Sequence, residues 1–322
     1  MTDTTRRALL LAALGACASP SRAQAWPDRA VRLICGYPAG SSPDMQARLL
    51  SEPLSRALGQ PVVVENKPGA SGNLGADAIA HANDGHSIGI VGNGPLTSSR
   101  FLYSRLGYDP AKDFAPIALV AAGPLVLVTP SALGLDTAEK LVRFARAQGD
   151  RIAYGSSGAG SGTHLGMELL KQNFGWQALH VPYAGAPPII NGLMGGQLQM
   201  ALLPPSTVMP LVQTGKLTAL AVSSARPSPL APGLPSLGDL GVKNVNIEVW
   251  NAIVAPASMP SAHRARLSAD LQKILAAREI RQTLFLQGWK VDDTSPQALM
   301  QRIQADSAAY RDVIARNHIR LD

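Results

Sequence analysis

Two turns in this chain place glycine and small polar residues between a short apolar strand and the start of a helix. In the first, residues 36–42 follow a strand predicted at 31–35, with Ser42 as the expected N-cap and Pro43 as the first helical residue. Free N–H groups at a helix start, at the carboxyl end of a strand, favour a bound anion. The expected ligand contacts here are Ala39, Gly40, Ser41 and Ser42.

The second turn lies near the middle of the chain. A strand predicted at 152–154 runs into the Gly-, Ser- and Thr-rich segment 155–164, and a helix is predicted over 165–173. Glycines let the backbone approach a ligand closely, and hydroxyls add hydrogen bonds. The expected contacts here are Ser156, Ser157, Gly160, Ser161 and Thr163. Either turn alone is equally compatible with an ordinary strand-to-helix loop, but two turns with almost no Lys or Arg predict two jaws that hold one small carboxylate.

Three further residues are candidates for the same site. Asn93 directly follows a strand predicted at 87–92 and could reach the cleft between the two jaws. His164 could donate to a carboxylate, or it could cap and pack its own helix. Tyr183 could offer a hydroxyl or a ring to the ligand, or it could belong to the core. Asp44 is expected to be structural, because a negative charge is favourable in a first helical turn and Arg48 follows four residues later.

Enzyme motifs do not occur in the sequence. The stretch 155–159 fails the nucleophile-elbow pattern at its last position, and the six histidines form no pair at metal-ligand spacing. We therefore expect a protein that is not an enzyme, with no cofactor and no metal. The alternative is a secreted serine hydrolase that uses Ser157 or Ser161 with His164, although neighbours on one loop make poor triad geometry and no acid partner is evident.

Length and composition predict a globular protein of two domains. The 322 residues are 46% hydrophobic and 16% charged, and the net charge of +7 is scattered, which argues against nucleic acid as a partner. Strand and helix signals alternate from Val31 onward and predict βαβ units with mainly parallel sheets. The Pro- and Gly-rich stretch 226–240 is interpreted as a crossing connection between domains, and the helical tail from Ser261 as a brace on the first domain.

The N-terminus has the pattern of an export signal. Arg6 and Arg7 precede an apolar stretch at 8–16 that is too short to span a bilayer. We expect a periplasmic protein with residues 1–25 as signal peptide and cleavage after Ala25. Lipidation at Cys17 is the alternative, and the paired arginines leave Sec and twin-arginine export both open. The other cysteine, at 35, lies in an apolar strand and is expected to be buried.

The chain resembles the Bug-type extracytoplasmic solute receptors, which are the binding components associated with tripartite tricarboxylate transporters. The blocks that carry the resemblance follow in order along nearly the whole mature chain, at 37–44, 65–75, 154–165, 180–185 and 193–197. The resemblance implies an α/β, two-domain periplasmic binding-protein-like fold with the ligand in the cleft between domains. It also implies a di- or tricarboxylate or aromatic acid as ligand, and a tripartite tricarboxylate-type permease or a sensor as partner.

Domain boundaries and departures from the family pattern complete the expectations. We place the first domain at 26–122 and 226–322 and the second at 123–225. Asn191 and Gln199 stand where acidic residues are frequent in the family, and an apolar stretch at 202–206 replaces a more polar one. Since an acidic residue there could pair with an ammonium group, we expect a ligand without an amine.

Overall fold

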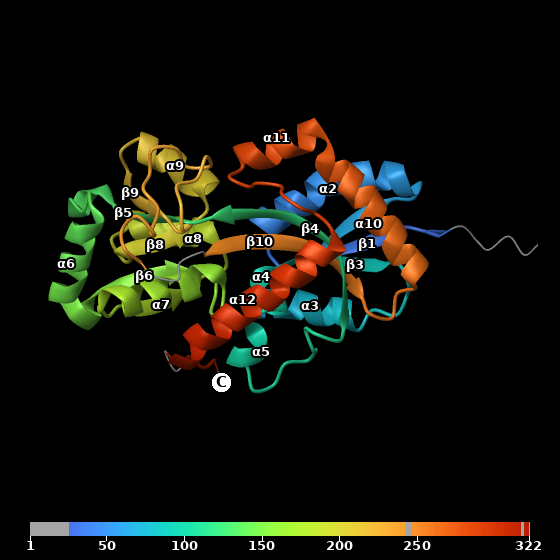
Figure 1. Cartoon of the computed structure of the whole chain (residues 1–322), viewed down its shortest axis with the longest axis horizontal. Coiled ribbons are helices and arrows are strands. Elements are labelled where there is room, and N and C mark those ends of the chain that lie inside the picture. The colour runs from blue at the N-terminus through green and yellow to red at the C-terminus, as the bar shows by residue number, and fades with distance from the viewer. Residues whose placement is uncertain (1–25, 243–246, 317–318, 322) are drawn as a thin grey trace, which may run out of the picture.

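The molecule consists of two α/β domains that lie side by side along its longest axis (Figure 1). The computed structural model describes residues 26–242, 247–316 and 319–321. Each domain is built on one five-stranded sheet, and two long strands run between the domains in the middle of the view. The expected α/β fold with two domains is therefore confirmed.

The two sheets have the same arrangement of strands. The first has the order β2 (Val62–Asn66), β1 (Val31–Cys35), β3 (Ser87–Gly92), β10 (Glu248–Pro256), β4 (Phe114–Pro124). The second has the order β7 (Leu179–Pro182), β6 (Ala153–Ser156), β8 (Met200–Leu203), β5 (Val126–Pro130), β9 (Leu217–Val222). In each sheet the fourth strand, β10 or β5, runs antiparallel to both neighbours.

These antiparallel strands correct the expectation of mainly parallel sheets. Their direction has a physical cause, because both enter their sheet directly from the other domain. The chain leaves the first sheet through β4 and enters the second as β5 with only Leu125 between them. It returns to the first sheet as β10. A strand that arrives by such a crossing keeps the direction of the crossing, whereas a βαβ unit returns its next strand parallel to the last.

Helices cover both faces of each sheet, so the central strands are buried on both sides. On the first sheet, one face carries α2 (Ser42–Leu58), α10 (Ser261–Ala276) and α11 (Arg278–Leu286), and the other carries α3 (Asn73–Ala80), α4 (Asn93–Leu96) and α12 (Pro296–Arg316). On the second, one face carries α6 (Ala138–Gln148) and α7 (Gly162–Phe174), and the other carries α8 (Ala186–Met194) and α9 (Pro205–Gln213).

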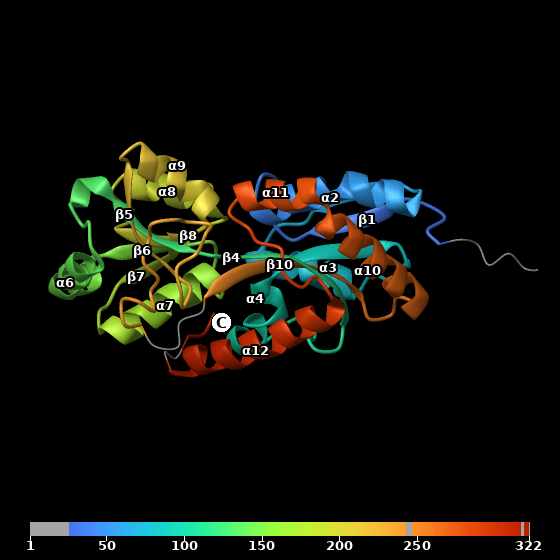
Figure 2. The same ribbon diagram turned by 45° about the horizontal axis from the view of Figure 1, so that its top comes forward.

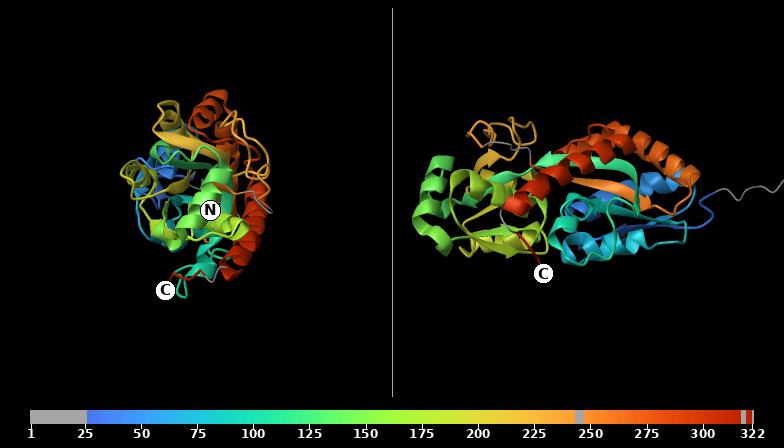
Figure 3. Two further views of the ribbon diagram at one scale, coloured as in Figure 1. Left: turned by 90° about the vertical axis from the view of Figure 1, so that its left-hand side faces the viewer. Right: turned by 60° about the horizontal axis from the view of Figure 1, so that its bottom comes forward.

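The C-terminal helix α12 touches both domains rather than the first alone. Its Leu299 packs in the first domain, whereas Tyr310 and Ile314 form a small buried cluster with Leu165 of α7 and with Leu102 of α5 (Ser99–Leu102). Figure 3 shows α12 running from one lobe to the other. The brace expected from the sequence therefore also reaches across the junction, which the apolar spacing of the helix alone does not reveal.

The Pro- and Gly-rich stretch 226–240 does not cross between domains. Leu237 lies in the core of the second domain, and the N–H of Val222 donates to the carbonyl of Pro235 at 2.9 Å, so the stretch lines the free edge of β9. The same core includes Val242 and Ile247. We propose that the second domain extends to about Ile247, not to 225, and that β10 is the return crossing.

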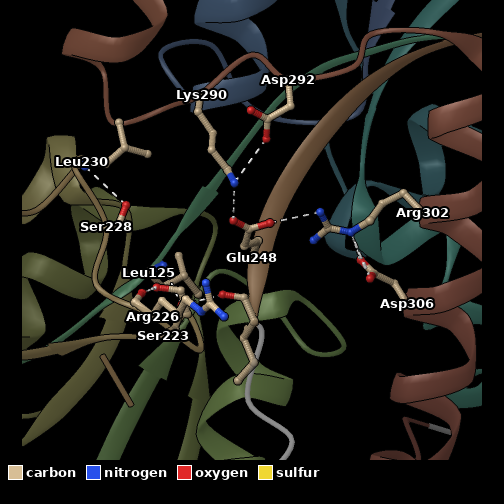
Figure 4. Close-up of polar contacts among 12 residues, drawn as sticks. Leu125, Ser223, Arg226, Ser228, Leu230, Glu248, Lys290, Asp292, Arg302 and Asp306 are labelled. Atoms are coloured by element: carbon tan, nitrogen blue, oxygen red, sulfur yellow. Dashed lines mark hydrogen bonds and ion pairs between the residues drawn. The ribbon is translucent and has the colours of Figure 1, made fainter. Parts of the chain in front are cut away.

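The two crossings are tied together where they pass between the sheets (Figure 4). The fully buried Ser223 donates its hydroxyl hydrogen to the carbonyl of Ile247 at 2.5 Å and accepts from the N–H of Leu125 at 2.8 Å. Beside it, the carboxylate of Glu248 pairs with Lys290 at 3.2 Å and Arg302 at 3.1 Å. The start of β10 is thus anchored to two segments of the first domain.

Candidate functional site

The first predicted turn lies at the carboxyl end of β1 and leads into α2. The helix begins one residue earlier than expected, so Ser41, not Ser42, is its N-cap. The Ser41 hydroxyl donates to the carbonyl of Pro38 at 2.6 Å and does not cap the helix. Gly40 has a φ of +80°, a conformation that favours glycine, and both it and Ala39 are exposed. The first N–H groups of α2 have no intrahelical acceptor, so the turn presents donors to a ligand.

Asp44 holds this turn in shape, as expected. Its side chain is buried and accepts hydrogen bonds from the N–H of Gly40 at 2.9 Å, Arg48 Nε at 3.0 Å and Asn66 Nδ2 at 2.8 Å. Burial raises the pKa of the Asp44 carboxyl, but these hydrogen bonds outweigh it and keep the pKa below its usual value. Both carboxylate oxygens are therefore engaged within the protein.

The second predicted turn follows β6 and leads into α7, which begins at Gly162 and not at Leu165. Ser161 is the N-cap: its hydroxyl oxygen accepts from the N–H of His164 at 3.3 Å. The hydroxyl oxygen of Thr163 accepts from the N–H of Ser157 at 2.9 Å and lies within 3.0 Å of the hydroxyl oxygens of Ser157 and Ser161. These three hydroxyls form one cluster at the helix start, where an anion is favoured.

The second-domain turn meets loops of the first domain across the junction. The hydroxyl of Ser98, which follows α4, donates to the carbonyl of Gly160 at 2.7 Å, and both residues are buried. A Cβ placed on Gly158 would lie only 2.4 Å from Ser71 Oγ, in the loop between β2 and α3. Figure 2 shows the start of α7 facing α4. The carboxyl ends of β2 and β3 in one domain and of β6 in the other therefore point into one shared region.

Asn93 also lies at this junction. It is buried at the start of α4, and its Nδ2 donates to the hydroxyl oxygen of Tyr310 on α12 at 3.0 Å. A Cβ on Gly162 would lie 3.2 Å from the same nitrogen. One hydrogen of the Asn93 amide is thus used between α4 and α12, next to the start of α7.

Three other candidates make contacts within the second domain. Tyr183 packs half-buried against the cluster around Ile189, which is the core role considered as its alternative. Ser156 is fully buried, and its hydroxyl lies 2.6 Å from His180 Nε2. His164 is buried, and its Nδ1 accepts from the N–H of Gly160 at 3.0 Å, which matches the helix-start role considered for it.

The same geometry gives no support to the serine hydrolase alternative. The His164 ring bonds to a backbone N–H and to neither Ser157 nor Ser161, so it is not placed to take a proton from either hydroxyl. Among residues 26–242, 247–316 and 319–321, no group of three or more His, Cys, Asp or Glu side chains could hold a metal ion.

Sequence reasoning missed Ser71, Ser98 and His180. Ser71 stands in the block 65–75 that resembles the family but was assigned no role, and nothing in the local sequence marks Ser98, because its partner belongs to the other domain and lies far along the chain. His180 stands in one of the blocks that resemble the family, yet the histidine itself was assigned no role. Its contact with Ser156 depends on the pairing of β6 with β7.

Comparisons with known proteins agree along nearly the whole chain. The profile described as tripartite tricarboxylate transporter family receptor matches residues 46–319. BugT of Bordetella pertussis is 31% identical over 273 residues, which cover 84% of this chain and 84% of that protein. The Rhodopseudomonas palustris protein Rpa4515 with adipate has a TM-score of 0.86 at 30% identity, covering 92% of this chain and all of that one. MatC of the same species, with bound malate, has a TM-score of 0.83 at 26% identity, covering 90% of this chain and all of that one.

Proposed function

This chain belongs to the tripartite tricarboxylate transporter family of receptors, and on that premise we propose that it captures a small carboxylate between its two domains in the periplasm. The observation that carries the proposal is the meeting of the second-domain turn with loops of the first domain. Gly158 and Gly160 of this turn lie against Ser71 and Ser98, in the first-domain segments that follow β2 and β3. Carboxyl ends of parallel strands are where open α/β sheets bind ligands.

The charges around the turns point to an acid without an ammonium group. Asp44 is fully engaged by its three donors, and Lys67 pairs with Glu65 at 3.4 Å. The donors left for an anion are N–H groups and hydroxyls, each worth roughly 1.5–3 kcal/mol toward a charged partner. Gln199 gives no information about an amine on the ligand, because its amide bonds to the backbone of its own domain. Relatives with adipate and malate make linear dicarboxylates the first candidates.

We also propose that the chain is exported and that the mature protein begins at Trp26. The export signal and Cys17 lie outside the described residues. Trp26 itself is docked, since its indole N–H donates to the carbonyl of Gly85 at 2.8 Å and its ring stacks on His263 at 4.5 Å. In the described part of the chain, no helix has the length and hydropathy to cross a membrane. Intact-mass analysis of the exported protein separates cleavage after Ala25 from lipidation at Cys17.

The partner belongs to the proposal as well. A receptor of this family that closes on its ligand presents a new surface made of both domains, which a membrane permease of the tripartite tricarboxylate type, or a sensor protein, can recognise. Calorimetric titration of purified permease with the loaded and the empty receptor tests this step. Equal affinity for both forms would contradict recognition of the closed state.

A thermal-shift screen of the mature chain tests the ligand class. The panel contains adipate, malate, citrate, benzoate and glutamate, the last as the amine-bearing control. At 100 times its dissociation constant a ligand adds about 2.7 kcal/mol of stability, which a melting curve resolves. We expect a dose-dependent shift with the dicarboxylates and none with glutamate. No shift with any acid, together with no small molecule released on denaturation, would overturn the proposal.

A further inference from the structure

Beneath the second-domain turn lies a stack of aromatic rings drawn from three elements. The imidazoles of His164, on α7, and His180, on β7, are parallel to within 13° with centroids 3.9 Å apart. The ring of Tyr154, on β6, lies 5.1 Å from His180 and 6.3 Å from His164. We call His164 and His180 the histidine stack.

Each histidine holds a different part of the turn through a different ring nitrogen. His164 Nδ1 accepts from the N–H of Gly160 at 3.0 Å, so the proton of this neutral ring is on Nε2. His180 Nε2 lies 2.6 Å from the hydroxyl of Ser156. That hydroxyl oxygen in turn lies 3.3 Å from the nitrogen and 3.1 Å from the carbonyl oxygen of Gly158. The stack therefore holds the backbone at 158 and 160.

These two glycines are the residues of the turn that meet the first domain. Gly158 faces Ser71, and the carbonyl of Gly160 accepts from Ser98. Their φ angles are +118° and +78°, in the region that glycine adopts readily and other residues rarely do. A backbone with two such residues needs side-chain contacts to keep one conformation, and the histidine stack supplies them from below.

The surroundings keep both rings neutral. Burial, His180 and the Lys171 ammonium lower the pKa of His164 to about 3. Burial also lowers the pKa of His180 to about 4, against the opposing effect of Glu168. Glu168 accepts from the Tyr154 hydroxyl at 2.5 Å and pairs with Lys171 at 2.8 Å, so its charge is already compensated within the same layer.

We propose that His164 and His180 are positioning residues for ligand capture: as neutral rings they set the second-domain turn in the conformation that meets the first domain and the ligand. The inference rests on the proposed function, because the turn matters for binding only if the ligand lies there. A protonated His164 has no acceptor nitrogen and releases the N–H of Gly160.

Substitution of each histidine by asparagine or glutamine distinguishes the roles of its two ring nitrogens. Asparagine places a polar atom near the position of Nδ1, and glutamine places one near the position of Nε2. We expect His164→Asn to bind adipate within about twofold of the wild type and His164→Gln to bind it roughly tenfold more weakly, because the buried N–H of Gly160 is left unpaired. At the second ring the order reverses, so His180→Gln retains binding and His180→Asn weakens it roughly fivefold. Within each pair both variants lose the ring, so the loss of stacking cancels.

The ligand-free protein provides an independent readout by ¹H–¹⁵N NMR. We expect the Nε2–H tautomer at His164, and slow exchange of the Gly160 amide in the wild type and in His164→Asn but fast exchange in His164→Gln. An Nδ1–H tautomer, or equal adipate affinity within both pairs of variants, would overturn the inference. If the wild type binds no acid although the NMR pattern holds, the proposed function fails while the positioning of the turn by the two histidines stands.

Discussion

Replacing Ser98 with alanine should weaken ligand binding and leave the ligand-free fold almost unchanged. The Ser98 hydroxyl is fully buried and donates to the carbonyl of Gly160, in the other domain, at 2.7 Å. Without it, that carbonyl has no partner when the domains are closed, which costs about 1–3 kcal/mol. In an open state water solvates the carbonyl, so the cost falls on the closed state alone. The dissociation constant should therefore rise by about 5- to 150-fold.

The neighbouring serine provides a matched control. Ser99 is also buried, and its hydroxyl donates to Asn73 Oδ1 at 2.8 Å, but both residues belong to the first domain. Ser99→Ala should lower the melting temperature, because its bond is present in the open and the closed state, and should leave the affinity near that of the wild type. Calorimetric titration with the acid that gives the largest thermal shift measures both variants. An unchanged affinity in Ser98→Ala, or an equal loss in Ser99→Ala, would refute the reasoning.

Three further predictions concern stability and reactivity. Glu248→Gln removes the charge that two cations share at the hinge and should lower the free energy of unfolding by about 2 kcal/mol, and an unchanged urea midpoint would contradict this. As the pH falls from about 6.5 to 4, His164 and His180 become protonated in the unfolded chain, whereas their rings stay neutral in the folded protein. Stability should therefore decrease by up to about 1.4 kcal/mol per pH unit for each ring, and this part of the slope should be absent from the His164→Asn/His180→Gln protein. Burial raises the pKa of the Cys35 thiol to about 11, so a thiol reagent at pH 8 should label it slowly in the native protein and quickly in urea; equal rates would show that the thiol is accessible.

Capture and release in this receptor depend on contacts of two kinds. The ion pairs of Glu248 and the bond from Ser223 to Ile247 lie at the crossings, so we expect them to persist whether the cleft is open or closed. The contact between Ser98 and Gly160 joins a first-domain loop to the second-domain turn, so we expect it only when the domains are closed. Substitutions at the hinge should therefore act mainly on stability, and substitutions at the turns mainly on affinity.

Local residue chemistry was sufficient to predict most elements and the two turns. The strand predicted at 31–35 has those bounds, and Thr137, the N-cap of α6, accepts from the N–H of Lys140 at 3.2 Å. Helix starts, apolar spacing and glycine turns depend on residues close together in the chain, so the sequence reveals them. Errors of one to three residues arose where neighbouring serines compete as cap, as at Ser41 and Ser42.

Tertiary structure alone decided how these parts meet. The direction of β5 and β10 follows from the crossings, and the position of 226–240 follows from apolar side chains that need the second sheet to bury them. Ser98 reaches Gly160 across 62 residues of sequence, and His180 reaches Ser156 across 24. No periodicity or motif encodes such contacts, because they exist only after two separately formed sheets and their helices have packed together. The sequence by itself therefore determined that two turns suited to an anion exist. The packing of the domains determined which side chains support the second turn and which connect it to the first domain.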